Sequence, residues 1–243
     1  MTALETHGLG KTYRGGVVGI KALSLALPAG EVAGFVGPNG SGKTTTIRLL
    51  LDLLRATEGR ATLLGLDSRR DSIEVRRRVG FLPGDLAFHG GLGGRETLDF
   101  YASLRPSRPP VLRAELLDRL GLDATVLARR VSTYSTGMRR KLGLAIALQH
   151  DPALAILDEP TTGLDPLVRR RYHDAIRAWK ARGAGRALFL CTHDMLEVEA
   201  LCDRVLVVRE GRLVADRRVE EMKAATDRAR SLEDVILSYY ATP

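Results

Sequence analysis

A glycine-rich stretch at residues 37–45, GPNGSGKTT, combines the residue types that hold a phosphate group. It matches the pattern G-x-x-x-x-G-K-[ST] at Gly37, Gly42, Lys43 and Thr44. Glycines let backbone N–H groups point inward, the lysine offers a charge to the β- and γ-phosphates, and the threonine hydroxyl can bind magnesium. The other loop residues that we assign to nucleotide binding are Asn39, Gly40, Ser41 and Thr45. The stretch predicts that the chain binds a nucleoside triphosphate.

Polar residues that could act on a bound triphosphate follow two later apolar runs. Asp158 ends the run LAILD and can hold magnesium through water, whereas Glu159 points elsewhere and could polarise an attacking water. Acids at strand ends are also ordinary helix caps, but the phosphate loop favours the functional interpretation. His193 follows the run ALFLCT. Because parallel strands end on one side of a sheet, we expect this histidine beside the γ-phosphate.

The elements that must position these residues indicate an α/β fold. The first 30 residues alternate loosely around Gly and Pro, which predicts short antiparallel strands. Residues 31–37 read as a buried strand that runs into the glycine-rich turn, and VGFLP reads as a further short strand. The runs ending at Asp158 and before His193 are continuously apolar, as expected of parallel strands that are covered on both faces.

Helical patterns occupy the segments between and after these strands. Four apolar residues at spacing i, i+3, i+4 and i+7 predict an amphipathic helix after the phosphate loop, and they are Ile47, Leu50, Leu51 and Leu54. Residues 95–130 contain two more helical patterns separated by RPSRPP, which indicates a helical insertion. Residues 204–215 predict a hairpin around Glu210-Gly211, and the tail predicts a helix that Ser231 and Asp234 open as a capping box.

Composition narrows the class of protein. The chain has 243 residues, 44% of them hydrophobic, and contains no apolar run of about 18 residues that could span a bilayer. Its start lacks the pattern of a secretion signal, so we expect a cytosolic chain.

Cys191 and Cys202 suit neither a disulfide framework nor a common zinc site, and we expect two reduced thiols. The net charge of +8 is spread over separated basic triplets without interleaved aromatics, which favours solvated helix faces over a nucleic-acid or membrane surface.

A helix that begins within TYSTGM, residues 133–138, opens with small hydroxyl and glycine residues. Such an opening suits backbone and hydroxyl groups that must approach another group closely. Ser135, Gly137 and the positive end of the helix form an anion site.

The ordered set of a phosphate loop, YSTGM, LDEP, GLD (residues 163–165) and TH resembles the nucleotide-binding subunit of an ATP-binding cassette (ABC) transporter over nearly the whole chain. The resemblance implies a P-loop NTPase core with a mostly parallel sheet, an N-terminal antiparallel β subdomain and an inserted α-helical subdomain. It divides one ABC ATPase domain, residues 1–243, into three parts. These are the core with its antiparallel β subdomain (1–88 and 150–216), the helical subdomain (89–149) and a helical tail (217–243).

The same resemblance implies roles for particular residues. Ser135, Thr136 and Gly137 form the signature sequence, which grips the γ-phosphate of an ATP held by a second protomer. Tyr13 stacks on adenine, and Asp165 links the two sites across the dimer. The implied cofactors are ATP and Mg²⁺. The implied partners are separate transmembrane permease subunits and a second copy or a paralogous ATPase, at the cytoplasmic face of the membrane, with no nucleic acid.

Two departures from the family pattern stand out. The signature usually reads Leu-Ser-Gly-Gly-Gln, whereas this chain carries Tyr134, Thr136 and Met138. After FLP the family places a glutamine that reaches magnesium, and this chain has Gly84 followed by Asp85. Glycine has no side chain that could bind a metal, so our hypothesis is that Asp85 or water takes over.

The resemblance favours ATP hydrolysis that powers a membrane transporter, with Glu159 as base, Lys43 as phosphate ligand and His193 as γ-phosphate contact. STGM and the terminal SLEDVILSYY resemble the export branch. An alternative is a non-transport ABC ATPase that acts on DNA or ribosomes, but such relatives carry a coiled-coil or zinc insertion or two cassettes. A P-loop kinase does not explain YSTGM, and the absence of an Asn-Lys-x-Asp motif favours ATP over GTP.

Overall fold

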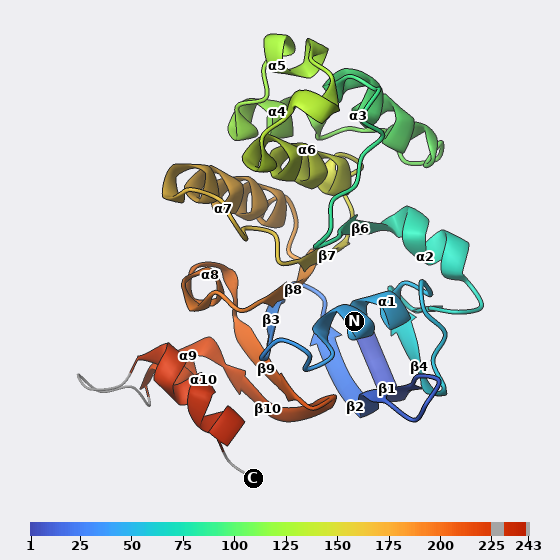
Figure 1. The fold of residues 1–243 in the computed structure, drawn as a ribbon, viewed down its shortest axis with the longest axis vertical. Coiled ribbons are helices and arrows are strands. Elements are labelled where there is room, and N and C mark those ends of the chain that lie inside the picture. Colours follow the sequence, from blue (N-terminus) through green and yellow to red (C-terminus); the bar gives the residue numbers. More distant parts are fainter. Residues whose placement is uncertain (225–230, 242–243) are drawn as a thin grey trace. The chain divides into compact units, whose positions relative to one another are not determined.

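The computed structural model describes residues 1–224 and 231–241 (Figure 1). These residues cluster in two compact units. The first unit comprises Met1–Val75 and the described residues from Ala187 onward, and the second comprises Arg76–Arg186. Within the described ranges, no helix combines the length and the apolar character that a bilayer crossing requires.

An antiparallel sheet forms one part of the first unit. Its strand order is β2-β1-β4-β5, with bounds β1 (Thr2–Thr12), β2 (Val18–Pro28), β4 (Glu58–Leu63) and β5 (Leu66–Asp67). The antiparallel pairing was predicted, but β1 and β2 have 11 residues each and are not short. Both pairings of β1 are interrupted by a register shift in the middle of the strand, after Thr6 in the pairing with β2 and after His7 in the pairing with β4.

A second group of strands includes β3, which leads directly into the phosphate loop. β3 (Val32–Val36) pairs in parallel with both β8 (Ala187–Thr192) and β9 (Arg204–Arg209), and β9 forms the predicted hairpin with β10 (Arg212–Arg218). Every residue of β3 and β8 is buried, which explains their apolar sequences. Val36 lies opposite Thr192, so the chain leaves both strands at the same edge, at Gly37 and His193.

The helix after the phosphate loop is shorter than predicted. α1 spans Lys43–Leu50, so Leu51 is its C-cap and Leu54 lies beyond it. The correction has a local cause, because Asp52 adopts a φ of 53° and this left-handed conformation cannot continue a helix. The amides of Leu53 and Leu54 turn back to the carbonyl of Arg48.

The C-terminal part of the first unit contains short helices. They are α8 (Met195–Leu201), α9 (Val219–Ala224) and α10 (Leu232–Ala241). The predicted capping box is confirmed: the Asp234 amide donates to Ser231 Oγ at 3.2 Å, and the Ser231 amide donates to Asp234 Oδ2 at 2.7 Å. Cys191 and Cys202 are confirmed as buried thiols.

The second unit combines one parallel strand pair with most of the helices. β6 (Val79–Leu82) lies beside β7 (Leu154–Asp158), and Leu82 is opposite Leu157. Between them the chain is helical, as predicted, apart from connecting loops. The helices of this unit are α3 (Gly94–Ser103), α4 (Arg113–Leu120), α5 (Ala124–Ala128), a 3-10 turn (Val131–Thr133), α6 (Thr136–Leu148) and α7 (Pro166–Ala181), while α2 (Ser72–Arg78) contains the boundary between the units.

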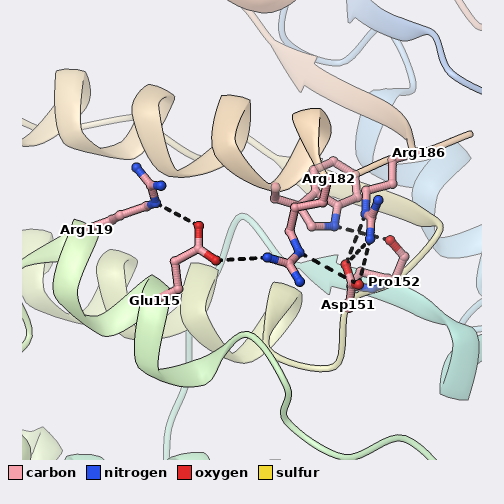
Figure 2. Close-up of polar contacts among 7 residues, drawn as sticks. Glu115, Arg119, Asp151, Pro152, Arg182 and Arg186 are labelled. Carbon is pink, nitrogen blue, oxygen red and sulfur yellow. Dashed lines mark hydrogen bonds and ion pairs between the residues drawn. The ribbon is translucent and has the colours of Figure 1, made fainter. Parts of the chain in front are cut away.

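A chain of alternating charges joins α4, the end of α7 and the turn before β7 (Figure 2). Glu115 accepts from Arg119 at 3.0 Å and from Arg182 at 3.1 Å. Arg182 also approaches Asp151. Both carboxylate oxygens of Asp151 accept hydrogen bonds from Arg186, and the shortest of these contacts is 2.6 Å. The pair of Asp151 and Arg186 is the better buried part, so we expect it to contribute most of the stabilisation.

The start of β7 is therefore fixed from two directions. Besides the contacts of Asp151, the indole N–H of the buried Trp179 on α7 donates to the carbonyl of Pro152 at 3.2 Å. Both contacts lie immediately before the strand that ends at Asp158. These contacts hold the chain at the start of the strand that carries the acidic residues at its other end.

Candidate functional site

The phosphate loop connects β3 to α1 and ends at a residue that must be glycine. Gly42 has a φ of 108°, and a Cβ atom there would lie 2.4 Å from Ile20 Cδ1 and 2.7 Å from the carbonyl oxygen of Gly19. Gly42 is also the N-cap of α1, and no side chain caps that helix start. The first-turn N–H groups of α1 are therefore oriented for an anion, which is the arrangement that phosphate binding uses.

Positive charge lies within the loop itself. Lys43 is only 7% exposed, and its ammonium donates to the carbonyls of Gly37 at 2.7 Å and Pro38 at 3.2 Å. The buried Ser41 Oγ has no hydrogen-bond partner among the residues that the structure describes. An uncapped helix start, a buried ammonium and a buried hydroxyl are a donor set that fits a polyphosphate, and Gly40, with a φ of 80°, completes the turn.

Tyr13 lies beside the start of α1. Its hydroxyl is 3.1 Å from Thr45 Oγ1, and the ammonium of Lys11 is 5.6 Å from the centre of its ring. A Cβ atom at Gly19 would lie 2.8 Å from the ring, so this glycine leaves space for it. Tyr13 is 37% exposed, so a base could reach it, and its role in adenine binding stays a prediction.

His193 follows β8 directly and is exposed. The residues on either side of His193 hold the turn in place. The Asp194 amide donates to Thr192 Oγ1 at 3.0 Å, and Asp194 caps α8. His193 therefore belongs to the same unit, and to the same edge of the parallel strands, as the phosphate loop. Its contact with the γ-phosphate stays a prediction.

The predicted acidic pair lies in the second unit, at the end of β7. Asp158 is 4% exposed, and Glu159 follows with a φ of 48°. A left-handed backbone at a residue other than glycine costs about 1–2 kcal/mol, and such conformations concentrate at functional sites. The Glu159 carboxylate accepts a hydrogen bond from the Thr162 hydroxyl at 3.0 Å. This contact orients the predicted base, and sequence reasoning missed it although the two residues are only three positions apart.

The loop after β6 brings Gly84 next to the predicted metal ligand. A Cβ atom at Gly84 would lie 3.3 Å from Asp158 Oδ2. Asp85 is exposed and contributes to a cavity of about 280 Å³, which is also lined by Thr136, Arg139 and Arg140 of α6. That Asp85 takes over the role of the usual glutamine at magnesium therefore stays a hypothesis.

The small-residue opening of α6 has the geometry of a helix start that is open to a ligand. Ser135 is the N-cap and accepts from the Met138 amide at 3.2 Å. A Cβ atom at Gly137 would meet only ordinary contacts, the nearest being Leu164 at 3.7 Å. This chain's own packing therefore does not require a glycine here, although glycine in a helix costs about 0.5–1 kcal/mol relative to alanine.

Asp165 begins the next helix. Its Oδ1 atom accepts from the amides of Leu167 at 3.1 Å and Val168 at 3.0 Å, so the carboxylate caps α7. Capping uses Oδ1 and stabilises the helix within one chain. The predicted link across a dimer would use Oδ2 of this exposed residue. That link stays a prediction.

The residues suited to magnesium are Thr44, Asp158 and Asp85. The described residues contain no cluster of three or more His, Cys, Asp or Glu side chains that could hold a metal by themselves. Magnesium in nucleotide sites is commonly held by one or two carboxylates, with phosphate oxygens and water completing the shell, so such a cluster is not needed. Thr44 belongs to the first unit and the two aspartates to the second, and their joint binding of a metal that arrives with its nucleotide stays a prediction.

Comparison with known proteins decides the family. The model of the ABC transporter family matches residues 20–162, more than half of the chain. The chain belongs to the ABC transporter family. A daunorubicin resistance ATP-binding protein of Streptomyces coeruleorubidus, DrrA3, is 40% identical to this ABC protein over 239 residues, which cover 97% of this chain and 74% of the relative.

Two further matches agree with this family. The daunorubicin/doxorubicin resistance ATP-binding protein DrrA of Streptomyces peucetius is 40% identical over 226 residues, covering 92% of this chain and 67% of that protein. A solved structure of the ATP-binding subunit of an ABC transporter is 26% identical, with a TM-score of 0.85, and covers 98% of this chain and 99% of that chain. This ABC protein therefore has the predicted α/β fold, binds ATP and is an ATPase subunit that powers transport.

Proposed function

We propose that this ABC ATPase drives export of a drug-like molecule, and that it works as one of two protomers that bind ATP between them. The observation that supports the pairing concerns Gly137, close to Ser135 at the start of α6. Packing within the chain does not require a glycine at this position. A close approach by another molecule's phosphate would explain why the position has no side chain.

The residues of the chain divide the chemistry among them. Lys43 and the loop amides bind the phosphates and offset the charge that spreads over their oxygens in the transition state. Glu159, oriented by Thr162, accepts a proton from the attacking water, and His193 contacts the γ-phosphate. Magnesium, held by Thr44 and Asp158 with Asp85 as a further candidate ligand, would neutralise phosphate charge when bound.

The proposed partners are separate membrane-spanning subunits and a second ATPase protomer, either a copy of this chain or a paralogue. The chain would then lie on the cytoplasmic face of the membrane. Export is supported by the two 40% identical relatives, which are named for resistance to daunorubicin or doxorubicin. We propose that residues 1–243 act as one ABC ATPase domain in this assembly.

ATP turnover by the purified chain tests the proposed chemistry. Lys43→Ala should abolish ATP binding, whereas Glu159→Gln should leave binding intact and lower turnover by at least about 100-fold, because only the proton acceptor is lost. Turnover near the wild-type rate in Glu159→Gln would contradict the assignment of the base.

Export needs its own experiment. Cells that express the chain together with a candidate membrane subunit should retain less daunorubicin than cells that express the Lys43→Ala variant with the same subunit. Equal retention in both, with ATP hydrolysis intact in the purified chain, would exclude this drug class as cargo and leave the ATPase assignment standing.

A further inference from the structure

The residue before the signature serine is held by its side chain. Tyr134 is 3% exposed, and its hydroxyl donates to the carbonyl of Val126 on α5 at 2.7 Å. Gly94, the first residue of α3, makes room for this hydroxyl, because a Cβ atom at Gly94 would lie 2.1 Å from Tyr134 Oη. The two residues are 40 positions apart and fit only as a pair. Burial raises the pKa of Tyr134, so the hydroxyl remains a donor at neutral pH.

The backbone of the same residue is held as well. The Tyr134 carbonyl accepts from Arg139 Nη1 on α6 at 2.7 Å, and its amide donates to the carbonyl of Val131 at 3.1 Å. Tyr134 is thus bound through its side chain, amide and carbonyl. The next residue, Ser135, is exposed and begins α6.

We propose that Tyr134 is a positioning residue that fixes the signature in the orientation in which it meets the ATP of the second protomer. The proposal rests on the proposed function, since it requires that two protomers share their ATP. A segment that is already ordered loses less conformational entropy when it binds, so its affinity is higher. The leucine usual at this position has no hydroxyl, and this chain, which also departs at Thr136 and Met138, gains a hydrogen bond there.

The proposal separates two affinities that a general loss of structure would lower together. ATP binding by a single protomer uses the phosphate loop in the first unit, whereas Tyr134 and its partners all belong to the second unit. Removing the tyrosine hydroxyl should therefore weaken ATP-dependent pairing and leave the affinity of the single protomer for ATP unchanged.

The test measures pairing in a Glu159→Gln background, in which ATP is retained. Tyr134→Phe should raise the protein concentration for half-maximal ATP-dependent dimerisation by roughly tenfold, since both signatures of the dimer would then have to be ordered on pairing and not beforehand. Thr6→Val is the matched control. It also removes a buried hydroxyl that donates to a carbonyl, that of Leu23 at 2.9 Å, but lies in the first unit, and it should leave pairing unchanged.

A second variant reaches the same residue from its other side. Arg139→Gln removes the hydrogen bond to the Tyr134 carbonyl and should weaken pairing in the same direction, beyond the effect of Arg140→Gln, which removes the same charge at the next position. This comparison remains informative if Tyr134→Phe does not fold.

The outcomes separate this inference from the proposed function. Weakened pairing with unchanged single-protomer ATP affinity supports it. If the Glu159→Gln parent pairs with ATP but Tyr134→Phe pairs equally well, or if Arg139→Gln and Arg140→Gln behave alike, the inference is overturned and the proposed function stands. If the parent binds ATP and does not pair, the proposed function fails first.

Discussion

Gly84 lies against the carboxylate of Asp158, so closely that a Cβ atom at Gly84 would be 3.3 Å from Asp158 Oδ2. The pairing of β6 with β7 places these two residues together, because Leu82 is opposite Leu157 and both strands run in the same direction. The position at which the family carries a glutamine therefore does adjoin the predicted metal ligand. In this chain it leaves the carboxylate without a neighbouring side chain from that position.

Adding one methyl group at position 84 should disturb the metal site specifically. Gly84→Ala requires no left-handed backbone, but a contact of 3.3 Å is tight, so the Asp158 carboxylate must shift by a few tenths of an ångström. We expect a severalfold higher magnesium concentration for half-maximal ATPase activity, with the affinity for metal-free ATP unchanged. A magnesium titration at fixed ATP measures this. An unchanged magnesium requirement would argue against Asp158 as a ligand.

The variant Asp85→Ala tests whether Asp85 compensates for the missing glutamine. If its carboxylate helps to hold magnesium, Asp85→Ala should also raise the magnesium requirement. Asp118→Ala is a suitable control, since it removes the same charge from an exposed position on α4 of the same unit. Unchanged magnesium-dependent ATPase activity in Asp85→Ala would exclude the compensating role and leave water as the replacement.

Gly137→Ala should make the fold more stable and the ATPase less active. The new methyl group meets no close neighbour, so the free energy of unfolding should rise by about 0.5–1 kcal/mol. The same methyl group should block ATP-dependent pairing. Gly143→Ala on the same helix is the opposite case, because its Cβ atom would lie 2.7 Å from Leu82 and should destabilise the fold. Urea denaturation and sedimentation measure the two effects, and normal pairing in Gly137→Ala would contradict the assigned role.

His150 should make the stability depend on pH. It is 5% exposed, and burial, with the nearby cations Arg105 and Arg108, lowers its pKa to about 3. A histidine in the unfolded chain has a pKa of about 6.5, so the unfolded chain binds more protons than the folded chain between about pH 3 and 6.5. Stability is therefore lost as the pH falls through this window, on the order of 2 kcal/mol from this group between pH 7 and 4.5.

The replacement His150→Leu should remove that part of the pH dependence. Urea denaturation at pH 7 and 4.5 measures the difference in the free energy of unfolding, and the loss on acidification should be smaller in the variant. The exposed His89 provides the control, because His89→Leu should leave the loss unchanged. An equal acid-induced loss in wild type and His150→Leu would contradict the prediction.

Local patterns predicted the parts of the site that depend on neighbouring residues. The phosphate loop, the strand that ends at Asp158 and the cap at Ser231 each follow from a few consecutive side chains. The end of α1 did not, because the left-handed turn at Asp52 breaks an apolar spacing that continues through Leu54.

Contacts between distant positions could not be read from one sequence. Gly94 gave no sign that it accommodates Tyr134, because the fit depends on how α3 packs against the segment before α6. The closeness of Gly84 to Asp158 likewise depends on strand pairing across 74 positions. By contrast, the contact of Thr162 with Glu159 is local and could have been predicted from the turn that joins them.

The central claim is that each ATP is bound between two protomers. Sedimentation of Glu159→Gln with and without saturating ATP, with the bound nucleotide quantified, tests it most directly. The account predicts single protomers without nucleotide and a dimer that holds two ATP molecules when ATP is present. A single protomer saturated with one ATP at every protein concentration, alone or with a paralogue, would contradict it.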